Sequence, residues 1–106
     1  MRTQKTASPG VAVFKIPLTH PDIPKDIARI PLNIRQIIAR AIDERLGSDP
    51  VQFGEPLRRG LHGYRKLRVG DYRIIYEINK HDVQVLLIGN RKDVYDKAPR
   101  RVSKRS

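Results

Sequence analysis

The chain has 106 residues, enough for one domain with a single modest core. Its 22 Lys and Arg residues outnumber its 11 Asp and Glu residues, and the resulting net charge of +11 predicts attraction to polyanions such as nucleic acid or the ribosome. The chain contains no cysteine, which excludes disulfides, thiolate zinc sites and a cysteine nucleophile.

Other classes of protein are also disfavoured. The three histidines, His20, His62 and His81, lack the spacing of metal ligands, so we expect neither a bound metal nor a cofactor. No apolar run approaches the roughly 20 residues of a membrane span. The opening MRTQKTASPG is basic but lacks the apolar core of a signal peptide. We therefore expect a soluble cytoplasmic protein with no membrane contact.

The first half of the chain predicts one strand and two helices. Residues 1–10 form a flexible lead, and VAVFKIPL (11–18) has the Val, Ile and Phe content of a strand. The segment 19–30 predicts a short helix that Pro31 ends, and a longer helix begins at about Leu32. Its apolar residues follow the spacing of one buried helical stripe: Ile34, Ile37, Ile38, Ala41, Ile42 and Leu46.

The second half predicts a loop and three strands. Residues 48–63 are rich in Pro and Gly, although 56–61 could form an edge segment. Residues 64–78 predict a hairpin, and VQVLLIGNR (83–91) predicts a third strand. The whole is an α+β domain over residues 11–98, with the helices on one face of a four-stranded sheet that ends in an antiparallel meander. A basic tail follows from 99 to 106.

The hairpin has a defined register if its turn is Gly70-Asp71. Arg68 then lies directly opposite Arg73, on the same face as Lys66. Like charges directly opposite one another are destabilising, so this face is interpreted as built around an anion. The alternative is that the basic residues only form the solvated side of a sheet.

The motifs KLRVGDYRIIYEI (66–78) and VLLIGNRKDVY (85–95) resemble those of the RelE/ParE superfamily, the toxins of bacterial type II toxin–antitoxin modules. The same order of strand, two helices and meander spans about residues 11–98. Within this superfamily, RelE-like members cut mRNA on the ribosome, whereas ParE-like members poison DNA gyrase. The residues favour a RelE-like endoribonuclease, and gyrase inhibition remains the alternative.

The resemblance also implies roles for four residues. Lys66 matches a general base, Arg73 a phosphate-stabilising arginine, and Arg91 a general acid or charge stabiliser. Tyr95 matches a tyrosine that stacks on or orients the substrate nucleotide. The chain departs from the RelE pattern at Tyr64, where the pattern has a second strand lysine. Charge and resemblance together imply an acidic antitoxin as partner, beside the ribosome and mRNA.

The chemistry fits these residue types. RNA is cut when its own 2′-hydroxyl attacks the adjacent phosphate, which requires proton transfer and charge stabilisation but no metal. Arginine matches phosphate oxygens, and we expect Arg65, Arg68 and Lys92 to bind RNA phosphates. No paired carboxylates are expected near the basic face.

Two points stay open. His62 is an alternative general base, although a single loop histidine is more often merely polar. Arg91 shares a face with Arg73 only if an odd-length turn at 79–82 or a bulge at Gly89 shifts the register, since a simple two-residue turn would bury Arg91.

Overall fold

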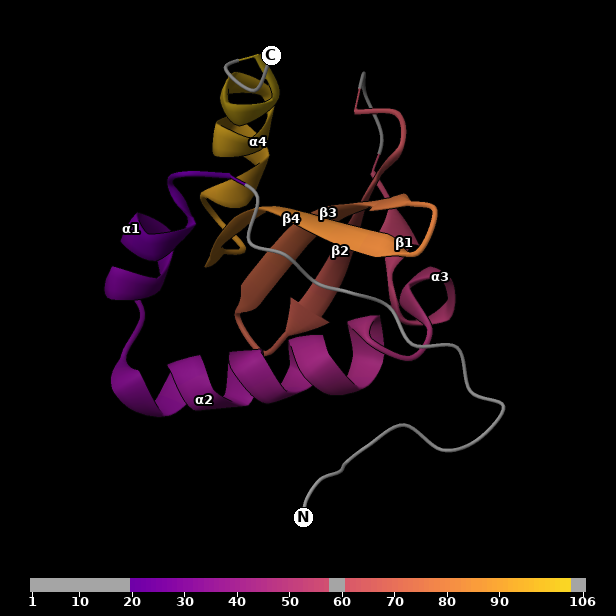
Figure 1. Ribbon diagram of the computed structural model, residues 1–106. Coiled ribbons are helices and arrows are strands. Elements are labelled where there is room, and N and C mark those ends of the chain that lie inside the picture. The colour runs from indigo at the N-terminus through magenta and orange to yellow at the C-terminus, as the bar shows by residue number, and fades with distance from the viewer. Residues whose placement is uncertain (1–19, 58–60, 104–106) are drawn as a thin grey trace.

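A four-stranded antiparallel sheet with the order β1-β2-β3-β4 forms the centre of the molecule (Figure 1). The structure is a computed structural model that describes residues 20–57 and 61–103. The strands are β1 (Glu55–Pro56), β2 (Tyr64–Val69), β3 (Tyr72–Asn79) and β4 (Asp82–Asn90). The predicted meander is therefore confirmed, whereas the predicted lead (1–10) and first strand (11–18) lie outside the described residues.

Two N-terminal helices pack on one face of the sheet, as the sequence predicted. They are α1 (Ile23–Ala28) and α2 (Leu32–Ala41), and α2 continues as the π-helical turn η1 (Ile42–Leu46). Ile38 and Leu46 are buried, but Ile37 is 52% exposed. It lies about 100° around the helix from Ile38, at the edge of the buried stripe.

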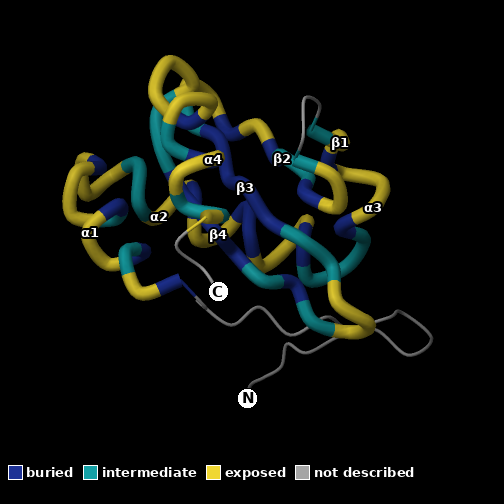
Figure 2. Tube along the Cα trace, turned by 90° about the horizontal axis from the view of Figure 1, so that it is seen from above, coloured by how far each residue is buried: buried dark blue, intermediate teal, exposed yellow. Residues whose placement is uncertain are grey.

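The two faces of the sheet carry separate apolar clusters, because neighbouring strand residues point to opposite sides. Ile74 and Tyr76 belong to the cluster under α1 and α2, whereas Ile75 and Leu87 belong to the other. Figure 2 shows the resulting concentration of buried residues along the central strands. Both faces of the sheet are therefore covered in part by helices.

The second face is covered by a helix that the sequence did not predict. Helix α4 runs over Val94–Ser103 and buries Val94 and Ala98 against the sheet. The expected tail from residue 99 thus begins inside this helix. Pro99 disfavours a helix at this position, because proline removes one helical hydrogen bond. The apolar contacts of Val94 and Ala98 and an ion pair at Arg101 hold the helix beyond it.

The segment before β2 also differs from the expected loop. It contains a short helix, α3 (Pro50–Phe53), whose first turn is capped by the Asp49 side chain, which accepts a hydrogen bond from the Gln52 amide. The edge strand β1 follows directly at Glu55, one residue before the segment in which an edge was considered.

A buried ion pair joins α1, β4 and α4. The Asp26 carboxylate accepts hydrogen bonds from both terminal nitrogens of Arg101, with an Nη2–Oδ1 distance of 3.1 Å. The Ile88 amide also donates to Asp26 (3.0 Å), and Arg101 donates to the Leu86 carbonyl (3.2 Å). Asp26 is 4% exposed. The two side chains therefore supply partners for backbone groups of β4 that its neighbour β3 does not satisfy.

One of those groups, the Leu86 carbonyl, belongs to a β-bulge. Ile75 is opposite Leu87 and Tyr76 is opposite Val85, so Leu86 is an extra residue on β4. Beyond the bulge, Gly89 lies opposite Arg73 and Asn90 lies opposite Tyr72. The bulge therefore sets the face on which every later residue of β4 lies.

We predict that Arg101→Met lowers the free energy of unfolding by about 3–5 kcal/mol, because it leaves the Asp26 carboxylate buried without its counter-charge. Methionine keeps much of the apolar stem, so the loss reports on the charge. Urea denaturation measures the change, with the exposed Arg100→Met as a matched control that costs less than about 0.5 kcal/mol. Equal losses for the two variants would contradict a stabilising role for the ion pair.

Candidate active site

Lys66 and Tyr95, two of the four predicted catalytic residues, lie together. Lys66 is on β2 and Tyr95 is in the first turn of α4. The Lys66 ammonium donates to the Tyr95 hydroxyl at 3.2 Å and lies 5.3 Å from the centre of its ring. The packing of α4 on the sheet therefore brings together two residues that are 29 positions apart in the sequence.

Glu55 is a third member of this cluster. It lies directly opposite Lys66 in the β1–β2 register, and its Oε1 is 3.9 Å from the Lys66 Nζ. The Lys66 side chain is 25% exposed, whereas that of Glu55 is 66% exposed. No sequence pattern indicated Glu55, because the contact depends on a two-residue strand within a segment interpreted as a loop.

A groove of about 870 Å³ opens beside Lys66. Its lining combines the charged cluster with apolar side chains from α4 and the segments flanking residues 58–60: Glu55, Pro56, Leu57, Leu61, Lys66, Tyr95, Asp96 and Pro99. Two carboxylates that the sequence did not indicate therefore lie in this groove. Both Glu55 and Asp96 line the groove, because β1 and α4 were not predicted.

Arg73 lies opposite Arg68, as the hairpin turn predicted. It is only 8% exposed, and its Nη1 donates to the carbonyls of Gly70 (2.9 Å) and Tyr72 (2.8 Å). These two acceptors offset the repulsion between the arginines. The register alone therefore does not require an anion between them.

Arg91 lies at the same hairpin turn. Its amide donates to the Asp71 carbonyl (2.8 Å), and its Nε is 3.9 Å from Asp71 Oδ1. The β3–β4 turn has two residues, Lys80 and His81, which without a bulge would have buried Arg91. The bulge at Leu86, three residues before the one considered at Gly89, shifts the register and leaves the Arg91 side chain 56% exposed.

Arg65, expected to bind RNA, is occupied by the protein itself. It is opposite Tyr76, and its Nη2 donates to the carbonyls of Val51 (2.6 Å) and Gly54 (3.0 Å). The guanidinium therefore ties α3 to β2. We leave Arg65 out of the proposed RNA contacts for this reason.

Tyr76 stabilises the same corner from the core. Its hydroxyl donates to the Pro50 carbonyl at 2.5 Å, and burial raises the pKa of this hydroxyl, an effect that the neighbouring Arg65 opposes. A Cβ on Gly54 would lie 1.7 Å from the Tyr76 oxygen. Glycine at position 54 is thus what lets the chain pass close to Tyr76 before it enters β1.

The remaining candidates are on the surface or in the core. Arg68 and Lys92 are exposed, and the Lys92 amide donates to the Asn90 side chain (2.9 Å). His62 is exposed and does not line the groove. Tyr64, at the position of the missing strand lysine, is buried under α4 in the second apolar cluster.

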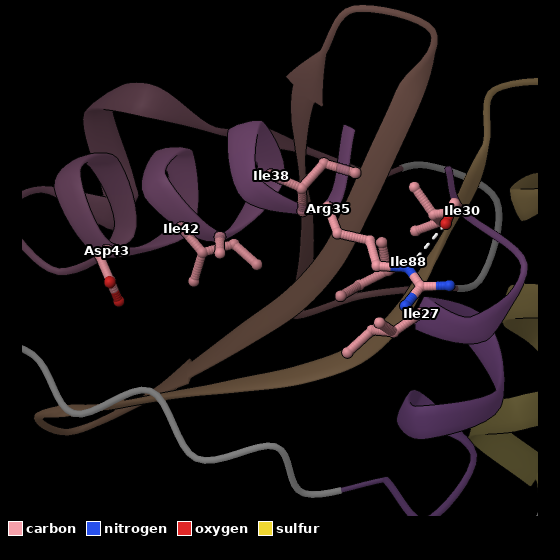
Figure 3. A pocket seen from close by; sticks show the side chains of 8 residues that line it. Ile27, Ile30, Arg35, Ile38, Ile42, Asp43 and Ile88 are labelled. Atoms are coloured by element: carbon pink, nitrogen blue, oxygen red, sulfur yellow. Dashed lines mark hydrogen bonds between the residues drawn. The ribbon is translucent and has the colours of Figure 1, made fainter. Parts of the chain in front are cut away.

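A second, apolar cavity of about 300 Å³ lies on the opposite face, between α1, α2 and β4 (Figure 3). Its lining is almost entirely aliphatic: Ile27, Ile30, Ile38, Ala39, Ile42 and Ile88, with Arg35 and Asp43. Arg35 donates from its Nε to the Ile30 carbonyl at 2.7 Å. This lining offers mainly apolar contact, with Arg35 and Asp43 as its charged members.

Residues 20–57 and 61–103 contain no cluster suited to a metal ion and no helix suited to a membrane span. In this part of the chain, no three His, Asp or Glu side chains come close enough to hold a metal ion. No helix within it has the length and apolar character needed to cross a membrane.

Solved structures share this arrangement of sheet and helices, which assigns the chain to the RelE-like fold. It aligns with the toxin–antitoxin complex RelBE2 from Mycobacterium tuberculosis with a TM-score of 0.70 and 28% identity, over 77% of this chain and 95% of the other. The isolated Escherichia coli RelE toxin aligns with a TM-score of 0.56 and 22% identity, over 86% and 99% of the two chains, which shows a shared fold.

Sequence comparison identifies the family. The family described as "ParE toxin of type II toxin-antitoxin system, parDE" matches residues 19–95, and the chain belongs to this family. Toxin RelE of Mycobacterium tuberculosis is 33% identical over 77 residues, covering 71% of this chain and 79% of the relative. Toxin RelG of the same organism is 33% identical over 73 residues, covering 67% and 84%. The predicted membership of the RelE/ParE superfamily is confirmed.

We predict that Arg65→Met lowers the free energy of unfolding by about 1–2 kcal/mol, because the Val51 and Gly54 carbonyls lose a charged donor. Arg68→Met is the matched control on the same strand and costs less than about 0.5 kcal/mol. Urea denaturation of both variants measures the difference. If Arg65→Met leaves the free energy of unfolding unchanged and weakens RNA binding as much as Arg68→Met does, Arg65 belongs to the RNA-binding surface.

Proposed function

We propose that this toxin arrests translation by cutting mRNA on the ribosome in the cytoplasm. The observation that carries the proposal is the contact of Lys66 with Tyr95 at the edge of an open groove, since it joins a proton-transfer group to an aromatic ring that can stack on a base. A relative that is 33% identical and named RelE supports the same function.

The proposed reaction uses the substrate's own 2′-hydroxyl as nucleophile and yields a 2′,3′-cyclic phosphate and a 5′-hydroxyl. Lys66 acts in proton transfer, and Tyr95 orients both the ammonium and the nucleotide. The exposed Arg91 stabilises the charge that develops on the phosphate, and Arg73 adds positive charge from the buried side of the same turn. This route requires no metal or cofactor, because the nucleophile belongs to the RNA.

Orientation must supply much of the rate, because the groove is open and, of the described residues, three charged side chains line it: Glu55, Lys66 and Asp96. Holding the 2′-oxygen in line with the phosphorus converts attack into an intramolecular step. We propose that the ribosome provides this alignment. The exposed cations Arg68 and Lys92 would bind neighbouring phosphates and set the position of the toxin.

An antitoxin is the proposed partner that controls this activity. Two solved structures with this fold are described as complexes of a toxin with its antitoxin, RelBE2 and RelB-RelE. The net charge of +11 favours an acidic polypeptide that orders on the basic surface.

Inhibition of DNA gyrase is the second candidate, because the matching family is described by the name ParE. The two functions separate in two assays with the same protein. We predict mRNA cuts in the ribosomal A site by toeprinting, and no trapped gyrase–DNA cleavage complexes in a supercoiling assay. The reverse result would establish the gyrase function.

We predict that Lys66→Met slows mRNA cleavage by roughly 10²-fold or more while changing ribosome binding less than about twofold, because proton transfer acts in the transition state. Single-turnover cleavage and co-sedimentation measure the two effects. The exposed Lys80→Met, at the β3–β4 turn, is the control for lost charge and keeps the full rate. Equal loss of rate and binding for Lys66→Met would make Lys66 a docking residue.

We predict that ribosome binding weakens steeply with salt. If Arg68, Arg91 and Lys92 each neutralise one phosphate, raising salt from about 50 to about 200 mM lowers affinity roughly 20- to 40-fold, through counterion release. Co-sedimentation across a salt series gives the slope. A flat series would indicate an apolar protein interface in place of phosphate contacts.

A further inference from the structure

The charged cluster in the groove contains a proton acceptor beside a proton donor. The Glu55 carboxylate is held opposite Lys66 by backbone pairing of β1 with β2, with 3.9 Å between Oε1 and Nζ. Its side chain is 66% exposed and lines the groove, so a bound RNA can reach it. An isolated surface ion pair of this length stabilises a fold by at most about 1 kcal/mol, so stability alone gives little reason for the arrangement.

The geometry separates the two roles in proton transfer. The Lys66 ammonium donates to the Tyr95 hydroxyl, and an ammonium has no lone pair with which to accept a proton. The carboxylate of Glu55 has lone pairs and no proton to give when it is ionised. The pair is therefore arranged with the acceptor at Glu55 and the donor at Lys66.

We propose that Glu55 is the general base and Lys66 the general acid of the cleavage reaction, an inference that rests on the proposed function. Glu55 takes the proton of the 2′-hydroxyl as the 2′-oxygen forms its bond to phosphorus. The bond from phosphorus to the 5′-oxygen breaks, its electron pair stays on that oxygen, and Lys66 supplies the proton. Glu55 then carries one proton more and Lys66 one fewer, and transfer between them restores both.

Two other groups in the groove take different places. Tyr95 accepts a hydrogen bond from the Lys66 ammonium and acts as a positioning residue for Lys66. Asp96 also lines the groove, but it comes from α4 and no strand register fixes it opposite Lys66. The matched carboxylate control for Glu55 is Glu44, which is exposed on η1 and does not line the groove.

The test compares two mRNA substrates on ribosomes, one normal and one with sulfur in place of the 5′-bridging oxygen at the scissile phosphate. A thiolate leaves without being protonated, so this substrate needs a base but no acid. We expect Glu55→Gln to slow cleavage of both substrates by roughly 10²- to 10⁴-fold. Lys66→Met should slow cleavage of the normal mRNA as much as Glu55→Gln does. On the sulfur substrate, Lys66→Met should cleave at close to the wild-type rate. Glu44→Gln should stay within about threefold on both.

A second measurement does not depend on the leaving group. In Glu55→Ala, added formate should restore part of the cleavage rate, because a free carboxylate can enter the space left by the side chain. Formate should not restore Lys66→Met. Urea denaturation midpoints of all variants, compared with wild type, establish that each is folded.

The outcomes are distinct. If the wild-type protein cleaves and Glu55→Gln keeps the same rate, the inference alone is overturned. Rescue of Glu55→Gln by the sulfur substrate, or a loss of rate in Glu44→Gln as large as in Glu55→Gln, overturns it as well. Failure of the wild-type protein to cut ribosome-bound mRNA overturns the proposed function and this inference with it. Replacing the 2′-hydroxyl by hydrogen at the scissile nucleotide should abolish cleavage by every variant, and persistence of the cut overturns the reaction itself.

Discussion

The buried pair of Asp26 and Arg101 is the interaction on which the site depends. It joins the first helix, the bulged strand β4 and the C-terminal helix α4, and it satisfies backbone groups of Leu86 and Ile88 that β3 leaves unpaired. Charges buried to this degree stabilise only when both are present and well bonded. Tyr95 lies on α4. The ion pair of Asp26 with Arg101, which holds α4 against β4, therefore also positions the hydroxyl that accepts a hydrogen bond from the Lys66 ammonium.

The cationic side chains of the protein fall into groups with different roles. Lys66 faces Tyr95 and Glu55 in the groove, whereas Arg73 and Arg91 gather at the Gly70-Asp71 turn. Other arginines, such as Arg65 and Arg101, serve the fold through carbonyls and a carboxylate. Net charge therefore predicts a polyanionic partner, but only the hydrogen bonds show which cations remain available to it.

Local rules were enough to predict the hairpin and the two N-terminal helices. Gly70 has the positive φ that the predicted turn requires, and the opposition of Arg68 to Arg73 followed from the turn alone. The family resemblance named Lys66 and Tyr95, which the structure brings together, while their roles stay proposals. Glu55, α4 and the bulge at Leu86 could not be found in the same way. Each depends on long-range partners: Glu55 on a two-residue strand, α4 on packing despite Pro99, and the bulge on Asp26 and Arg101.

The bulge has a consequence for how the length of this chain can vary. One extra residue in β4 reverses which side of the sheet all following residues occupy, including Gly89, over which Val94 packs closely. Deleting a single residue between the β3–β4 turn and Gly89 would place a bulky side chain against α4 and move Arg91 to the other side. Insertions or deletions of two residues would preserve both the glycine position under α4 and the side of the sheet on which Arg91 lies. Among related toxins, the number of residues between Asp82 and Arg91 should therefore change in steps of two or not at all.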